Sequence, residues 1–440
     1  MTERTERSEG HEGMPGWHGM TERTERTEVR PARPAPPRRP ALWIVLALLA
    51  AGTVRMGFVG ARFAGTYPIA TLTAVLLFAL LAVPFWLFVS ELDFLEREPV
   101  SLLVVAFAWG GLVATAASIP GSAALEDLIA KLGSPHLAAD WGATLAAPTI
   151  EEITKTLGIV AVVLIARDQV NSVLDGMVYG AMVGLGFQIV EDIVFALGAV
   201  ALAGQGDRTQ PVIATFLLRG FLAGVWSHTL FGAFAGAGIG YLVVRTDRSR
   251  RARAGMAVLG IGGAWASHVL WNSPLFDGLG NGGLALLLVL LVKGLPPLIG
   301  IVWLVRLAHD REAAFYASHL ARLDDPELIT AGELPVLASG SRRAAARWNA
   351  GARGYLTVRR LQRAQARLAV EISRASGEVS DGSVRRRAED VREQRTALVA
   401  LGVREATAAP RSWRQTASTV ATTVLAIAVL WAALSSLGGA

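Results

Sequence analysis

The fold class of this chain is indicated most clearly by residues 172–202, SVLDGMVYGAMVGLGFQIVEDIVFALGAVAL. This stretch is 31 residues long and carries only three charged side chains, whereas about 20 apolar residues in a helix suffice to cross a bilayer. Gly176, Gly180 and Gly184 recur at every fourth position, and this spacing lets two helix backbones approach closely. The stretch therefore predicts a membrane-spanning helix in close contact with a neighbour.

The rest of the 440-residue chain follows the same pattern. Apolar residues make up 52% and charged residues 18%, against about 25% charged residues in an average soluble domain. The mean hydropathy is +0.42, and the charges are concentrated in 1–40, 245–253 and 309–414. This composition excludes an ordinary soluble enzyme and a disordered chain, and it predicts an all-α, polytopic membrane protein.

The chain contains no cysteine, which excludes disulfides, thiolate metal sites and a cysteine nucleophile. Its net charge of +6 is compatible with nucleic-acid binding. The basic clusters, however, lie next to apolar segments, which is typical of the cytoplasmic face of a membrane protein. We therefore expect no nucleic-acid partner. The bias towards arginine, alanine and glycine suggests a GC-rich bacterial genome, and hence a bacterial cell membrane.

Apolar segments predict about nine transmembrane helices, at 41–60, 66–90, 101–120, 142–166, 172–202, 212–244, 255–275, 282–307 and 416–437. Arginines before the first segment and in the loop 245–254 place the N-terminus in the cytoplasm by the positive-inside rule. The predicted organisation is a disordered cytoplasmic tail (1–40, with Met20 as an alternative start), an eight-span membrane domain (41–308, active site in 142–275), a helical cytoplasmic insert (309–414) and a last span (415–440).

The insert is predicted to begin with two short helices broken at Pro335 and Gly340, followed by a helical hairpin over 341–402. Its arginine-rich faces are interpreted mainly as solvated surface, and its role stays open.

Ionisable residues inside a membrane are costly, which makes them functional candidates. Spans four to seven carry almost all of them: Glu151, Glu152 and Lys155, then Glu191 and Asp192, then Arg219 and His228, then His268 with Asn272. Counted from the cytoplasmic helix ends, the glutamates and histidines lie at roughly 20–28 Å in a core about 30 Å thick. The sequence therefore predicts that these four helices bring carboxylates and imidazoles to one level.

Helical spacing predicts which of these side chains meet. Glu151 and Lys155 are four residues apart, so we expect them to form an ion pair. Glu152 points about 100° away from Glu151, so we expect the two carboxylates not to face one spot. The same spacing places two further pairs on shared helix faces: Phe187 with Glu191, and His268 with Asn272.

Two chemistries fit such a cluster. Carboxylates and imidazoles can activate water and stabilise an oxyanion, or they can hold Zn²⁺. Motifs of other intramembrane proteases are lacking. There is no HExxH, and the letters GQGD at 204–207 lie in a predicted loop without the Tyr-Asp partner of aspartyl enzymes, so we interpret them as chance.

The order Glu151-Glu152-x-x-Lys155, Phe187 to Glu191, His228 and then His268 to Asn272 in successive spans resembles the PrsW family of intramembrane proteases, related to the CAAX-protease and bacteriocin-processing superfamily. The resemblance covers about residues 140–275. It implies cleavage of membrane-anchored proteins, such as anti-sigma-factor-like regulators, in or beside the lipid bilayer.

The resemblance also implies residue roles. Glu151 or Glu152 would activate water, and Glu191 would position that water or a metal. His228 and His268, with Asn272, would bind the metal or hold the oxyanion, so that Glu191, His228 and His268 are the candidate zinc ligands. Lys155, Phe187 and Asp192 would support the site. Metal-dependent and metal-free mechanisms both stay open. Asp192 stands where such sequences often have Asn, which puts an amide role at that position in doubt.

A second hypothesis is a proton- or cation-coupled transporter that uses the same Glu/His cluster as a relay. Transporters often show inverted repeats, and none is visible between the halves of this chain. The ionisable residues are also confined to four consecutive spans. These observations favour the protease. The substrate, the cleavage site and the oligomeric state are left open.

Overall fold

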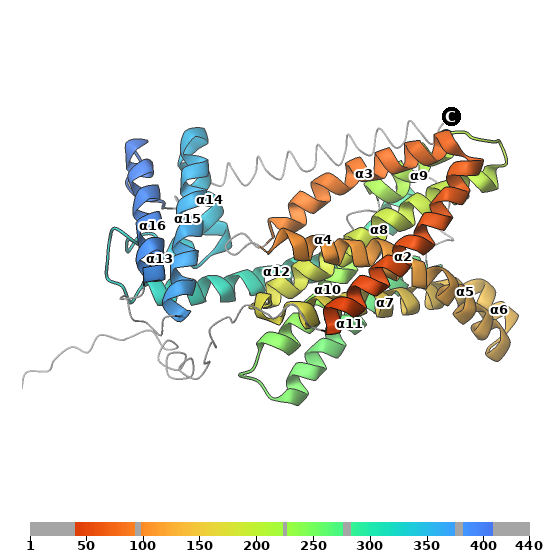
Figure 1. The fold of residues 1–440 in the computed structure, drawn as a ribbon, viewed down its shortest axis with the longest axis horizontal. Coiled ribbons are helices and arrows are strands. Elements are labelled where there is room, and N and C mark those ends of the chain that lie inside the picture. The colour runs from red at the N-terminus through yellow and green to blue at the C-terminus, as the bar shows by residue number, and fades with distance from the viewer. Residues whose placement is uncertain (1–39, 93–97, 223–226, 276–282, 375–381, 408–440) are drawn as a thin grey trace, which may run out of the picture. The chain divides into compact units, whose positions relative to one another are not determined.

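A computed structural model describes residues 40–92, 98–222, 227–275, 283–374 and 382–407 (Figure 1). Within these residues all regular structure is helical and no strand occurs, which confirms the predicted all-α class. The first half contains α2 (Pro40–Thr66), α3 (Pro68–Ser90), α4 (Val100–Ala108), η2 (Trp109–Ala114), α5 (Thr115–Leu132), α6 (Pro135–Leu137), η3 (Ala138–Gly142), α7 (Ala143–Ile165), η4 (Arg167–Gln169) and α8 (Val173–Ala203). The second half contains α9 (Gln210–Thr215), η5 (Phe216–Leu222), α10 (His228–Val244), α11 (Arg250–Asn272), α12 (Gly283–Leu320), α13 (Leu334–Leu337), α14 (Gly340–Asn349), α15 (Gly351–Arg374) and α16 (Gly382–Ala400).

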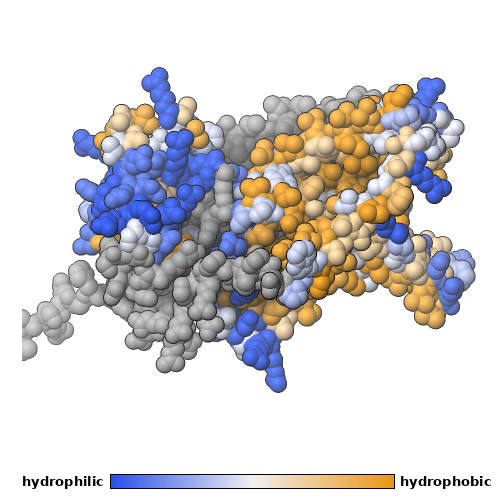
Figure 2. Space-filling model, viewed as in Figure 1, coloured by the Kyte–Doolittle hydropathy of each residue, from blue (hydrophilic) through white to orange (hydrophobic). Residues whose placement is uncertain are grey.

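Six of the described helices are long and apolar enough to cross a membrane: Pro40–Thr66, Pro68–Ser90, Val100–Leu132, Val173–Ala203, Arg250–Asn272 and Leu291–Leu320. Apolar side chains cover this part of the chain in Figure 2. The predicted count of nine is not confirmed. The predicted span at 142–166 forms α7, which is outside this set and carries three charged side chains, and the predicted span 416–437 lies outside the described residues.

The predicted span 212–244 is not one continuous helix. Its first part forms α9 and the π-helical turn η5, and Ser227 breaks the helical path with φ −109° and ψ −139° before α10 begins at His228. A π-helical turn inserts an extra residue, and such turns occur often at functional sites. His228 therefore lies at a helix start, and Arg219 lies on the separate turn η5.

Helix α8 lies at the centre of the membrane part and packs against α10, α3, α4, α7 and η2. The predicted close approach is confirmed on the face towards α10. A Cβ atom on Gly180 would lie 2.1 Å from the carbonyl oxygen of Gly232, and one on Gly184 would lie 2.0 Å from that of His228. These backbones touch directly because neither glycine carries a side chain. The contact places the start of α10 against the part of α8 that leads to Glu191.

A second face of α8 meets the end of α4 and the start of η2 in the same way. A Cβ atom on Gly186 would lie 1.9 Å from the carbonyl oxygen of Phe107, and one on Gly110 would lie 1.9 Å from that of Val183. The indole of Trp109 in η2 donates a hydrogen bond to the carbonyl of Thr154 in α7 at 3.0 Å. Helices α7 and α8 are thus held in register through η2.

The loop with the letters GQGD has a structural role. Asp207 accepts hydrogen bonds from the backbone N–H groups of Ile69 and Ala70, both at 2.8 Å, at the N-terminus of α3. A carboxylate at this position satisfies free amide groups and complements the helix dipole. This agrees with the interpretation of the motif as chance.

The helices after residue 320 have an apolar core of their own, which includes Leu320, Val358, Leu361 and Leu368. The predicted boundary at 308–309 falls inside α12, which continues to Leu320. Only one of the two predicted short helices forms, as α13, because turns occupy the residues before it. The predicted hairpin is α15 and α16, and α14 is separated from α15 at Gly351, whose φ of 69° favours glycine.

Candidate active site

Helix α7 supplies three buried charged side chains to the centre of the membrane part. Glu151, Glu152 and Lys155 are exposed by 6%, 1% and 0%. The ammonium group of Lys155 lies 2.5 Å from Oε1 of Glu152. The predicted Lys155–Glu151 pair is therefore wrong. Residues three apart are also neighbours on a helix, which allows Lys155 to pair with Glu152. The carboxylate of Glu151 instead points towards the two imidazoles.

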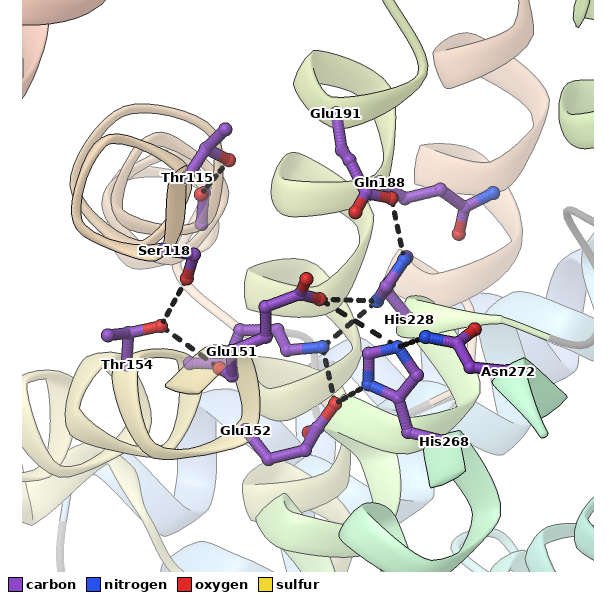
Figure 3. A network of polar contacts seen from close by, with 12 residues as sticks. Thr115, Ser118, Glu151, Glu152, Thr154, Gln188, Glu191, His228, His268 and Asn272 are labelled. Atoms are coloured by element: carbon purple, nitrogen blue, oxygen red, sulfur yellow. Dashed lines mark hydrogen bonds and ion pairs between the residues drawn. The ribbon is translucent and has the colours of Figure 1, made fainter. Parts of the chain in front are cut away.

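His268 of α11 contacts both glutamates (Figure 3). Its Nδ1 lies 2.8 Å from Oε1 of Glu152, and its Nε2 lies 3.8 Å from Oε2 of Glu151. The two carboxylates contact opposite nitrogens of this one imidazole, so they do not face one spot, as expected. A carboxylate only accepts hydrogen bonds, so Nδ1 of His268 carries the proton and Nε2 keeps its lone pair.

His228 is held in the same manner at the start of α10. Its Nε2 lies 2.9 Å from Oε2 of Glu191, and its Nδ1 lies 3.0 Å from the ammonium group of Lys155. The carboxylate identifies Nε2 as the protonated nitrogen, so Nδ1 carries the lone pair. Phe187 packs its ring 4.9 Å from the imidazole, and Phe187 and Glu191 thus both contact His228 from the shared face of α8.

Glu151 lies between the two histidines. Its Oε2 is 3.8 Å from Nδ1 of His228 and 3.8 Å from Nε2 of His268, and it is buried without a hydrogen-bond partner. One ligand atom from each of these three residues lies within 4.8 Å of the others. The candidate metal group therefore contains Glu151 in place of the predicted Glu191. Glu191 instead contacts Nε2 of His228, on the side of the ring opposite to Glu151.

Asn272 lies one turn beyond His268. Its Nδ2 is 3.3 Å from Nε2 of His268, and its backbone carbonyl accepts a hydrogen bond from the Thr144 hydroxyl at 2.9 Å. On the α8 side, Gln188 accepts a hydrogen bond from Thr229 at 2.9 Å and is 1% exposed. Gln188 was not predicted. An uncharged amide in an apolar helix gives a weaker signal than a charge does.

Arg219 also reaches the site, although it was not among the predicted site residues. From η5, its Nη2 donates to Oε2 of Glu191 at 2.6 Å and its Nε donates to Oδ1 of Asp192 at 2.7 Å. Asp192 is thus an acceptor paired with a guanidinium, which explains why an acid is tolerated there. The signal was present in the sequence, because Arg219 is an ionisable residue in an apolar segment.

Three atoms, Oε2 of Glu151, Nδ1 of His228 and Nε2 of His268, have the chemistry, the spacing and the surrounding charge to hold a divalent metal ion. Two imidazoles and a carboxylate form a common catalytic zinc set, and ligands of a tetrahedral zinc ion at about 2.1 Å lie about 3.4 Å apart. The 3.8 Å separations are slightly wider than that value. When both imidazoles are neutral, the site has a formal charge of −2. Four carboxylates contribute to it (Glu151, Glu152, Glu191 and Asp192), against the two cations Lys155 and Arg219.

Comparison with known proteins agrees with this geometry. The model of the family described as PrsW family intramembrane metalloprotease matches residues 98–296, which contain every side chain of the site. Comparisons with curated proteins and with solved structures give no match. Together with the membrane-spanning helices, this match identifies the chain as an intramembrane protease, and residues 98–296 are the part that is similar to the PrsW family of intramembrane metalloproteases.

Proposed function

We propose that this chain hydrolyses a peptide bond of membrane-anchored protein substrates, with Glu151, His228 and His268 as the reaction centre. The observation that carries the proposal is the convergence of three lone-pair atoms within 4.8 Å, in a buried site formed by four helices. Regulatory proteins such as anti-sigma factors are the substrate class that the family resemblance suggests.

We further propose that these three residues hold a zinc ion. A bound zinc ion would act as a Lewis acid on the scissile carbonyl and would make water a stronger nucleophile at neutral pH. The chain prepares both histidines for this role, since Glu152 and Glu191 each hold the other ring nitrogen in its protonated form. Carboxylates in that position orient imidazole ligands and raise their basicity.

Proton transfer is assigned to Glu151. Glu152 and Glu191 are already paired with the cations Lys155 and Arg219, whereas the ion-pair contacts of Glu151 are to the two imidazoles. A carboxylate has two oxygens, so one can contact the ion while the other accepts the proton of the attacking water. The Asn272 amide beside His268 would donate a hydrogen bond to the substrate oxygen as negative charge develops on it.

The test starts by finding the substrate. Membrane proteins are compared between cells that express the wild-type chain and cells that express Glu151→Gln, and fragments that depend on Glu151 identify the substrate. Cleavage is then measured in proteoliposomes for Glu151→Ala, Glu191→Ala and His268→Ala, with Asp127→Ala at an exposed position of α5 as the matched control. Loss of cleavage only in the first three supports the proposal.

Full activity in those three variants would overturn it. Proton- or cation-driven flux in the same proteoliposomes, without cleavage, would instead favour a transporter. Cleavage that depends on Glu151 but resists removal of all metal would overturn the zinc assignment alone.

A further inference from the structure

Arg219 is the one charged residue of η5, and it reaches the site from that element. It lies on the π-helical turn η5, while the carboxylates that it binds lie one after the other on α8. Its side chain is 35% exposed, against 14% for Glu191 and 2% for Asp192. The cation thus closes the site from its more exposed side.

The guanidinium is fixed in three ways. Two of its N–H groups bind two different carboxylates, at 2.6 and 2.7 Å, and its Cζ atom lies 3.9 Å from the ring centre of Phe195. Such forked geometry is specific to arginine, because a lysine ammonium is a single point charge without a planar face. Phe195 follows Glu191 by four residues on α8, so all three contacts come from one helix face.

The contact continues to the reaction centre through one atom. Oε2 of Glu191 accepts one hydrogen bond from Nη2 of Arg219 at 2.6 Å and another from Nε2–H of His228 at 2.9 Å. That hydrogen bond determines which nitrogen of His228 is protonated, and therefore leaves the lone pair of Nδ1 towards Glu151. Without the guanidinium, Glu191 and Asp192 would be adjacent acids without a neutralising partner, and Glu191 would be free to turn away.

We propose that Arg219 is a positioning residue of this enzyme: by holding Glu191 against Nε2 of His228, it fixes the tautomer and orientation in which His228 serves the reaction centre. This inference rests on the proposed function, because His228 must take part in the reaction. It does not require Arg219 to touch the substrate or a metal.

The test compares Arg219→Gln and Arg219→Lys with Arg208→Gln, a control in the exposed loop before α9. Removing a group that orients a ligand from behind typically costs about 10–100-fold in metal affinity or activity. We expect Arg219→Gln to lower kcat and zinc affinity by about that factor while KM changes less than about threefold. Arg219→Lys keeps the charge but loses the fork, so we expect an intermediate loss. It also serves as the second variant if Arg219→Gln does not fold.

A double variant separates positioning from simple charge balance. If Arg219 only neutralised the second acid, adding Asp192→Asn to Arg219→Gln would restore kcat. Positioning predicts no recovery, since Glu191 still lacks its donor. Wild-type kcat and zinc affinity in both single variants, or full recovery in the double variant, would overturn the inference. If Glu151→Ala is inactive while the Arg219 variants are unimpaired, this inference fails and the proposed function stands.

Discussion

Gly184→Ala tests whether the contact between α8 and α10 places His228. A Cβ atom at this position would lie 2.0 Å from the carbonyl oxygen of His228 and 2.9 Å from Cα of Thr229. Ordinary contact begins at 3.4 Å, so the start of α10 must move away by about 1.4 Å. The nearest atoms, in His228 and Thr229, are all backbone atoms, so no flexible side chain can absorb the movement.

The expected effect on activity follows from this displacement. A shift of about 1 Å at a catalytic group can cost about 100-fold in rate, so we expect kcat to fall by at least that factor. Overpacking typically costs about 1–3 kcal/mol, which a protein of this size can tolerate, so the variant should still insert. The assay is cleavage of the identified substrate in proteoliposomes, together with zinc affinity.

Gly198→Ala is the matched control on the same helix. A Cβ atom there meets no atom within 4 Å, so activity should stay within about twofold of wild type. Wild-type cleavage and zinc affinity in Gly184→Ala would show that this close contact does not position His228.

Other predictions concern the helices after residue 320 and the cap of α3. Glu333 is 2% exposed and bound by both terminal nitrogens of Arg395, so Glu333→Ala should lower the free energy of unfolding of these helices by about 3–5 kcal/mol. Glu327→Ala, which removes an exposed pair, should cost less than about 1 kcal/mol, and hydrogen exchange on the full chain measures both. Burial raises the pKa of Glu333, but the hydrogen bonds and charge of Arg395 outweigh it and hold the pKa below the usual range of a glutamate. Its stabilisation should therefore be complete above the pKa of an unfolded glutamate, about 4.3, and be lost as the pH falls through the lowered pKa, which exchange protection at decreasing pH would reveal. Asp207→Ala should cost about 1 kcal/mol in thermal unfolding and leave kcat unchanged, whereas an inactive, fully folded variant would contradict a purely structural role.

The membrane character and the convergence of these ionisable side chains were predictable because both depend on composition. Charges are rare in apolar segments, so Glu151, Glu191, His228 and His268 stand out, and helix rise alone places them at one depth. Small-residue spacing likewise predicted the close contact that Gly184 makes, because that contact requires only the absence of a side chain.

Partner choice inside the site was not predictable. Lys155 follows Glu152 by three residues and Glu151 by four, so helical spacing allows either pair. Only the positions of α10 and α11 decide that Lys155 binds Glu152. The break at Ser227 and the π-helical turn that carries Arg219 depend on backbone hydrogen bonds, which hydropathy does not report. The same break made a single span at 212–244 a wrong expectation.

The most direct test of the proposed zinc site is zinc stoichiometry and X-ray absorption on the chain purified in detergent. We predict one zinc ion per chain with two imidazole nitrogens and a carboxylate oxygen as ligands, and loss of the ion in Glu151→Ala and His268→Ala but not in Asp127→Ala. A metal-free chain that cleaves its substrate at the full rate, or a zinc ion that is retained when Glu151 and His268 are replaced, would contradict it.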